Sequence, residues 1–273
     1  WRNGSHRPIS DLTFRLGHLL GGTAAEGHRT FNLVLHGTNG FLLFVLLRRW
    51  AGQRTGLLAA ALFLVYPYHQ ESVVWLVGRE SALGTLAILL GLVIAGTGLR
   101  TPIKVGLMAL VLLLGVLCYE SALLLLPLAV LVAWSQRIPG WPGIRPILVV
   151  LGSAVLGWVL WRSGATDPGG NDYFIGLLPH DVPSTLLRIP KVAGRLFLPP
   201  EPDPAKQLLR AAVLGATFLV VVLFLRGGKG KAVMRSIPML LVLLTIMASA
   251  VAIGGGVSTV TSESDRFLYL PSA

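Results

Sequence analysis

One stretch of this apolar chain concentrates polar and charged residues. Residues 66–80 read Tyr-Pro-Tyr-His-Gln-Glu-Ser-Val-Val-Trp-Leu-Val-Gly-Arg-Glu and contain His69, Glu71, Arg79 and Glu80. Histidine and carboxylate side chains can move protons in general acid–base catalysis, and an arginine can hold a phosphate through paired hydrogen bonds. We therefore predict a polar site here, with Arg79 placed to hold a phosphate. The alternative is an interfacial loop whose charges lie in water.

Glu120 is a further candidate for this site. It lies between the apolar runs 103–118 and 122–134, with no base nearby in the sequence. An ionisable group close to membrane depth is costly unless it is paired or functional. We predict that Glu120 faces the same site, the alternative being a surface glutamate on a tight turn.

Metal and cofactor chemistry find little support in the sequence. His69 and Glu71 form a His-x-Glu pair without a third ligand, so we predict no metal site. The sequence contains no glycine-rich phosphate loop, nucleophile elbow or Cys-x-x-Cys motif, so we predict no cofactor.

The elements that must position these residues are membrane helices. The chain is 53% hydrophobic and only 13% charged, which is far from the composition of a soluble domain. We predict an all-α polytopic membrane bundle of about eight transmembrane helices. The apolar runs are 31–47, 56–68, 82–98, 103–118, 122–134, 146–161, 208–225 and 236–253. Several are shorter than the roughly 20 residues that span a bilayer, so we expect a recessed outer cavity between them.

The charges give this bundle an orientation. Successive segments between the apolar runs lie alternately on the two sides of the predicted membrane. All twelve carboxylates lie on one side, whereas eleven of the 23 Lys and Arg lie on the other side, which has no acid. That basic set is Arg48, Arg49, Arg54, Arg100, Lys104, Arg137, Arg145, Arg226, Lys229, Lys231 and Arg235. Basic loops stay cytoplasmic, so every acid is predicted to lie outside. The net charge of +11 is then an orientation signal, and we predict no nucleic-acid partner.

The charge pattern also decides how residues 103–134 cross the membrane. One long helix there would export the basic cluster at 226–235, whereas two short helices meeting at Tyr119-Glu120-Ser121 keep it inside. We expect a similar break at residues 67–71. If residues 72–81 are helical, Ser72, Trp75 and Arg79 share one face.

The segments outside the crossings complete the predicted organisation. Residues 1–273 form a single transmembrane domain that is expected to be incomplete at both ends. Residues 1–30 form an outer segment in which 9–20 read as a helix lying in the interface. Residues 163–207 form the largest outer loop.

Several motifs resemble one family of membrane enzymes. Pro67-Tyr68-His69-Gln70-Glu71 and Gly78-Arg79-Glu80 are similar to the His-Pro-x-His-Thr-Glu…Gly-Arg-x-Asp/Glu motif of the transmembrane and tetratricopeptide-repeat (TMTC) protein O-mannosyltransferases and their bacterial relatives. The family's other motifs follow the same order at Arg7-Pro8-Ile9-Ser10, Leu12-Thr13-Phe14-Arg15, Asn32-Leu33-Val34-Leu35-His36, Tyr119-Glu120-Ser121 and Asp265-Arg266-Phe267-Leu268-Tyr269-Leu270-Pro271-Ser272.

This resemblance implies a glycosyltransferase of the GT-C class. Such an enzyme would move a sugar, for instance mannose, from a polyprenyl-phosphate donor to a protein or glycan acceptor on the outer side. The resemblance places His69, Glu71, Glu80 and Glu120 at the catalytic site. We predict that Arg7, Arg79 and Arg266 contact the lipid phosphate, with membrane lipids as further partners.

Departures from the family keep other functions open. Tyr66 stands where the family has its first motif histidine, Gln70 replaces its threonine, and Tyr119 replaces the usual lysine. The family's principal acid is expected upstream of Trp1, so a fragment is indicated. The alternatives are a lipid-carrier transporter or flippase and an inactive membrane scaffold.

The abundance of Gly, Ala and Arg favours a bacterial inner membrane, with the active side facing the periplasm.

Overall fold

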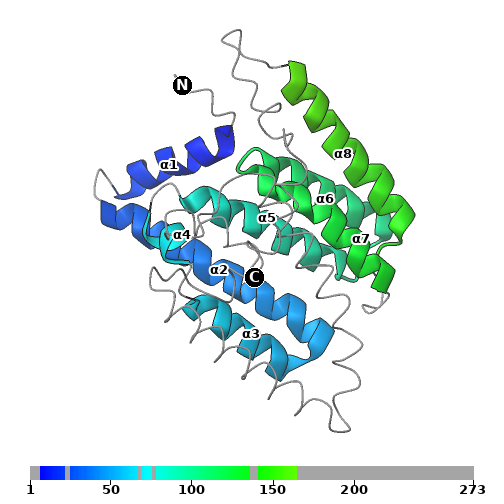
Figure 1. Cartoon of the computed structure of the whole chain (residues 1–273), viewed down its shortest axis with the longest axis horizontal. Helices are drawn as coiled ribbons and strands as arrows, with labels where there is room; N and C mark the ends of the chain where they lie inside the picture. Colours follow the sequence, from blue (N-terminus) through cyan, green and yellow to red (C-terminus); the bar gives the residue numbers. More distant parts are fainter. Residues whose placement is uncertain (1–6, 22–24, 67–68, 76–77, 136–140, 165–273) are drawn as a thin grey trace, which may run out of the picture.

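The computed structural model describes residues 7–21, 25–66, 69–75, 78–135 and 141–164, and within these ranges all regular structure is helical (Figure 1). The elements are α1 (Pro8–Gly21), α2 (Ala25–Ala51), α3 (Gln53–Val65), α4 (Gln70–Val74), α5 (Arg79–Ala95), α6 (Thr101–Val116), the 3-10 helix η3 (Glu120–Leu124), α7 (Leu125–Ser135) and α8 (Ile144–Gly164). The predicted crossings 208–225 and 236–253, the outer loop beyond residue 164, and Arg266 lie outside the described residues.

Helices α2 and α3 form an antiparallel hairpin along one side of the bundle (Figure 1). The turn between them is made by Gly52, whose φ of 90° is a conformation that glycine adopts without steric cost. At the other end of the hairpin, the His36 ring Nε2 lies 3.2 Å from the carbonyl oxygen of Leu64. The predicted run 31–47 therefore lies within α2, the part of the run 56–68 up to Val65 lies within α3, and the two helices pack against each other.

Helices α2 and α5 run in the same direction. Arg79, the first residue of α5, donates from Nε to Asn32 Oδ1 over 2.7 Å near the start of α2. At the far ends, Arg49 Nη1 donates to the carbonyl oxygen of Gly96 over 2.8 Å. Both helices thus begin at one end of the bundle and finish at the other, as the alternating charge pattern predicts.

The break predicted at residues 119–121 is present. Helix α6 ends at Val116 and η3 begins at Glu120, so the single long helix over 103–134 is excluded. Beyond the break the chain runs along α5, because Gly84 abuts Ser121 and Gly91, further along α5, abuts Leu125. The segment after the break therefore travels in the direction of α5, which is what two short helices meeting at one end require.

The condition under which Ser72, Trp75 and Arg79 would share one face, a single helix over 72–81, is not met. Helix α4 ends at Val74, and α5 begins only at Arg79. The side chain of Asn32 supplies the reason, because its Nδ2 lies 3.3 Å from the carbonyl oxygens of both Val73 and Trp75. The amide of Asn32 is thus a side-chain donor to both carbonyls, and the Trp75 carbonyl also accepts from Gly78 N over 3.2 Å, a bond between residues three apart that closes a tighter turn than an α-helix does. Ser72 and Arg79 consequently do not share one helix.

Large apolar side chains face outward on several helices. They include Leu33 and Phe41 on α2, Leu57 and Leu62 on α3, and Val149 and Leu156 on α8. Within the described ranges, α2 is the one helix long and apolar enough to cross a membrane, whereas Gln53–Val65, Thr101–Val116, Glu120–Trp134 and Ile144–Leu160 are apolar but shorter. The all-helical prediction is thus confirmed for the described residues, and the number of crossings stays a prediction.

Candidate functional site

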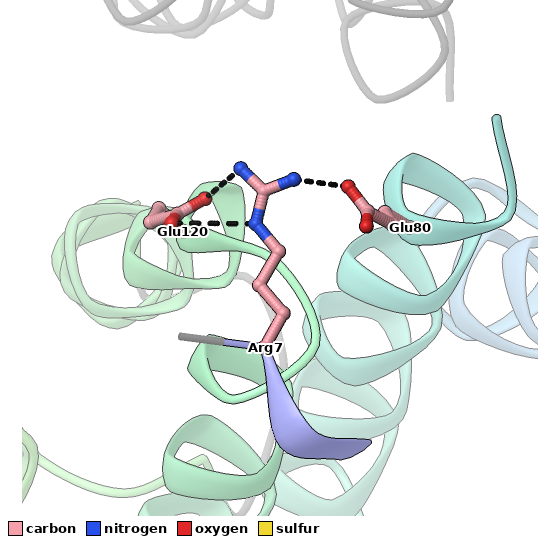
Figure 2. Close-up of polar contacts among 3 residues, drawn as sticks. All are labelled: Arg7, Glu80 and Glu120. Atoms are coloured by element: carbon pink, nitrogen blue, oxygen red, sulfur yellow. Dashed lines mark hydrogen bonds and ion pairs between the residues drawn. The ribbon is translucent and has the colours of Figure 1, made fainter. Parts of the chain in front are cut away.

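Three predicted site residues meet at the end of the bundle where α5 begins. Arg7 lies between Glu80 and Glu120 and forms an ion pair with each of them (Figure 2). Its Nη2 donates to Glu120 Oε2 over 2.8 Å, its Nε donates to Glu120 Oε1 over 3.4 Å, and its Nη1 donates to Glu80 Oε2. We call these three residues the Arg7 triad. A guanidinium that bonds two carboxylates in this way fixes their positions relative to each other.

Three separate elements bring the triad together. Arg7 directly precedes α1, and the first turn of α1 is tied to the end of α6, where Ile9 N donates to Leu117 O over 3.4 Å. Glu80 lies in the first turn of α5, and Glu120 begins η3. Gly84 permits the close approach of these two elements, because a Cβ at Gly84 would lie 2.5 Å from Ser121 Oγ.

The triad is only partly shielded from solvent. The side chains of Arg7, Glu80 and Glu120 are 20%, 17% and 27% exposed. Burial lowers the pKa of Arg7, but the attraction of Glu120 and Glu80 outweighs burial, and the net shift is upward. The pKa of Glu80 is raised, mainly by burial and further by Glu120 and Asp11, although Arg7 opposes the shift. Glu80 therefore has a raised proton affinity, which is the direction that favours a general base.

The structure places Arg79 in the interior instead of at a phosphate site. Its side chain is fully buried, and its guanidinium lies 4.4 Å from the ring centroids of both Phe14 and Phe31. Besides its bond to Asn32, its Nη1 donates to Thr13 O over 2.9 Å and its Nη2 to His28 O over 3.2 Å. Arg79 thus joins α1, α2 and α5, a placement that argues against the phosphate-holding role predicted for it.

His69 also lies apart from the triad. It is 2% exposed, and its ring packs against His36, Phe63 and Tyr66, with centroid distances of 4.9, 4.4 and 5.4 Å. Burial and the neighbouring His36 lower the pKa of His69 to about 3. A histidine held neutral in this way is a poor proton donor at neutral pH, so the geometry favours a packing role.

The remaining predicted residues are less informative. The backbone of Glu71 lies in α4, and Arg266 falls outside the described residues. Among the side chains that the structure describes, no group of three or more His, Cys, Asp or Glu is arranged to hold a metal ion.

A polar stripe on α2 was missed by the sequence interpretation. Asn32, His36 and Asn39 follow one helical face at intervals of four and three residues, and all three are buried. Each contacts a backbone carbonyl of another segment, and Asn39 Nδ2 donates to Ala82 O over 2.9 Å. Their helical spacing within an apolar run was the signal that could have identified them.

Comparisons with known proteins support one family. Over 89 residues, 32% of this chain, the sequence is 42% identical to Protein O-mannosyl-transferase Tmtc1 of Drosophila melanogaster. It is 34% identical to Protein O-mannosyl-transferase TMTC3 of Mus musculus over 85 residues and 35% identical to TMTC4 of the same species over 101 residues, 31% and 32% of the chain. The chain resembles the protein O-mannosyl-transferases over about a third of its length. No family model and no solved structure matches it.

The matched region is a small part of each relative. The chain spans 9 to 14% of the length of these proteins. The similarity therefore indicates a partial relationship to mannosyl-transferases. These relatives come from animals, so they give no support to the bacterial membrane that the composition favours.

Proposed function

We propose that this protein is a membrane glycosyltransferase that moves mannose from a polyprenyl-phosphate-linked donor to a hydroxyl group of a protein on the outer side of the membrane. The observation that carries the proposal is the Arg7 triad, which places one guanidinium between two carboxylates. The similarity to protein O-mannosyl-transferases supports the reaction class.

The triad contains the groups that such a transfer needs. The acceptor oxygen attacks the anomeric carbon of the sugar, and the bond from that carbon to the phosphate oxygen breaks. Arg7 stabilises the negative charge on the leaving phosphate, and Glu80 or Glu120 accepts the proton of the acceptor hydroxyl. All three side chains are partly exposed, so reactants can reach them.

The outward-facing apolar side chains support a lipid environment for this chemistry. Exposed leucines on α3 and α8 would be unfavourable in water but match lipid tails. In α1, Leu12, Leu16 and Leu19 are exposed along one helical face, which suits a helix lying in the outer interface beside the triad. We include the multi-pass topology and the outward orientation of the triad in the proposal.

The placement of the acids favours an enzyme over a lipid-carrier transporter. A transporter with alternating access needs polar groups on both sides of its binding site. Within the described ranges, the acids lie in α1, at the start of α2, in α4, at the start of α5 and in η3, and all of these positions belong to the outer set of segments. Such one-sided carboxylates suit a reaction carried out at one face.

The proposal is tested by reconstituting the full-length protein with polyprenyl-phosphate mannose and a serine- and threonine-rich peptide. We expect mannosylated peptide, and we expect whichever of Glu80→Gln and Glu120→Gln removes the proton acceptor to lower the rate by about 100-fold or more, which is typical of lost proton transfer. Asp11→Asn is the matched control, because it removes a nearby carboxylate outside the triad and should change the rate by less than about threefold. Unchanged transfer in both glutamine variants would remove the triad from the reaction.

A further inference from the structure

The guanidinium of Arg7 is already occupied by protein carboxylates. Glu120 takes two of its nitrogens, Nη2 and Nε, whereas Glu80 contacts only Nη1. A phosphate group forms the same charge-assisted bonds with a guanidinium as a carboxylate does. A phosphate that bonds to the Nη1 side of Arg7 therefore competes with Glu80, which has fewer bonds to lose than Glu120.

Displacing Glu80 changes its electrostatic surroundings. Arg7 and Asp11 face Glu80 from the α1 side, and Cys118, Tyr119 and Glu120 surround the triad from the connection between α6 and η3. Arg7 is the one described group whose attraction lowers the pKa of Glu80, whereas Glu120 and Asp11 raise it. Without the contact to Arg7, Glu80 is left among like charges and has a stronger tendency to take up a proton.

We propose that the phosphodiester group of an anionic lipid exchanges with Glu80 on Arg7, so that binding of the donor itself releases Glu80. This inference rests on the proposed function and adds a coupling to it. Glu80 is held by Arg7 while the site is empty of donor, and becomes the stronger base when the phosphodiester arrives. In a binding experiment without acceptor, the proton that Glu80 takes up comes from water. During transfer, only the donor complex in which Glu80 is still a carboxylate can accept the proton of the acceptor hydroxyl.

The exchange predicts a pH-dependent affinity that can be measured without any sugar transfer. The probe is a polyprenyl methyl phosphodiester, which has no sugar to donate and no phosphate proton that titrates near neutral pH. Its binding to the full-length protein in nanodiscs should tighten as pH falls, by up to about tenfold per pH unit, because one proton is taken up. A polyprenol of the same length, which lacks the phosphate, should show no such dependence.

Two matched variants identify Glu80 as the group that is displaced. In Glu80→Gln, an amide cannot hold Arg7 as strongly as a carboxylate does, so the phosphodiester should bind about tenfold tighter at about pH 7.5 and lose the pH dependence. Asp11→Asn removes a neighbouring charge without touching Arg7, and it should keep the pH dependence and change the affinity by less than about threefold. Soluble dimethyl phosphate shows whether the lipid chain contributes: equal affinity for both probes would overturn the assignment to a lipid ligand.

The outcomes are separable from those of the transfer assay. Binding by the unaltered chain that does not depend on pH overturns the exchange, even if Glu80→Gln fails to fold. Equal affinities of Glu80→Gln and Asp11→Asn for the phosphodiester overturn it as well. Transfer of mannose with either of these results would keep the proposed function and reject the coupling.

Discussion

Charged side chains in this bundle differ in what surrounds them, and their surroundings decide their roles. Arg7 and Arg79 are both arginines close to Glu80, yet Arg7 contacts carboxylates and Arg79 contacts carbonyls and aromatic rings. Guanidinium groups bonded to neutral carbonyls and stacked on rings join elements together. A guanidinium bonded to partly exposed carboxylates can exchange partners, and therefore suits a binding site.

His69 gives a prediction for the pH dependence of stability. Its pKa of about 3 in the folded protein lies below the ordinary value of 6.5, because burial and His36 disfavour its charged form. The neutral ring therefore contributes stability that is fully present above pH 6.5 and is lost as pH falls toward 3. We expect the free energy of unfolding in detergent to fall by at most about 1.4 kcal/mol per pH unit through this proton.

The variant His69→Gln isolates this contribution from other titrating groups. Its free energy of unfolding should depend less on pH between about 6.5 and 4 than that of the unaltered protein, as measured by thermal unfolding at each pH. The raised pKa of Glu80 acts in the opposite direction in both proteins and cancels in the comparison. If the free energy of unfolding had the same pH dependence in both proteins, His69 would not be held neutral by the fold.

The residue types at the site could be predicted from the sequence, but their grouping could not. Arg7, Glu80 and Glu120 were all predicted, although 73 residues separate Arg7 from Glu80 and 113 separate it from Glu120. Local patterns carry no information about such distant contacts. The interior contacts of Arg79 could not be predicted for a related reason, since two of its acceptors are backbone carbonyls, which every residue possesses.

At the scale of the elements, the polar stripe on α2 stabilises two interrupted segments. Asn32 contacts carbonyls at the end of α4, and His36 contacts one at the end of α3. A helix end leaves carbonyls without backbone donors, and in an apolar surrounding such groups are costly. The stripe thus supports the ends of α3 and α4 near the site. The sequence predicted a break after α3 from the charge pattern, but it did not predict the one after α4 or the supporting role of the stripe.

Arg79 provides a test of how α1 is held. Arg79→Ala would leave the carbonyls of Thr13 and His28 and the side-chain oxygen of Asn32 without this donor, so we expect a loss of about 3 kcal/mol or more in stability. Arg29→Ala is the control, because Arg29 is an exposed arginine on α2, and it should stay within about 0.5 kcal/mol. Thermal unfolding in detergent measures both, and equal losses would contradict the joining role of Arg79.

Gly115 tests the close packing of α5, α6 and η3. A Cβ at this position would lie 2.5 Å from the Cβ of Ala87 and 2.8 Å from that of Ala122, and neither atom can rotate away. Gly115→Ala should therefore separate the helices and lower the free energy of unfolding by about 1 to 3 kcal/mol. At Gly106, where a Cβ meets nothing within 4 Å, alanine should instead be neutral or stabilising by up to about 1 kcal/mol. A neutral Gly115→Ala would show that the packing is looser than the structure indicates.

At the scale of the whole molecule, the helix directions agree with the charge pattern of the sequence. Arg48, Arg49, Arg54 and Arg100 lie where α2 ends, α3 begins and α6 begins. Glu80 and Glu120 lie at the opposite end, where α5 and η3 begin and where both residues meet Arg7 (Figure 2). This arrangement could be predicted because membrane insertion acts on charge and hydropathy, which are local properties of the sequence. Which end of the bundle faces the cytoplasm is a prediction that cysteine labelling can test.

Two exposed positions at opposite ends of the bundle suit this experiment. Ala25 begins α2 at the end that holds the triad, and Gly98 lies between α5 and α6 at the basic end. In a Cys118→Ser background, which removes the buried native thiol, a membrane-impermeant maleimide should label Ala25→Cys in intact cells. It should label Gly98→Cys only after the membrane is permeabilised, because basic segments remain cytoplasmic. If only Gly98→Cys were labelled in intact cells, the triad would face the cytoplasm. If both cysteine variants were labelled, the helices between Ala25 and Gly98 would not cross the bilayer.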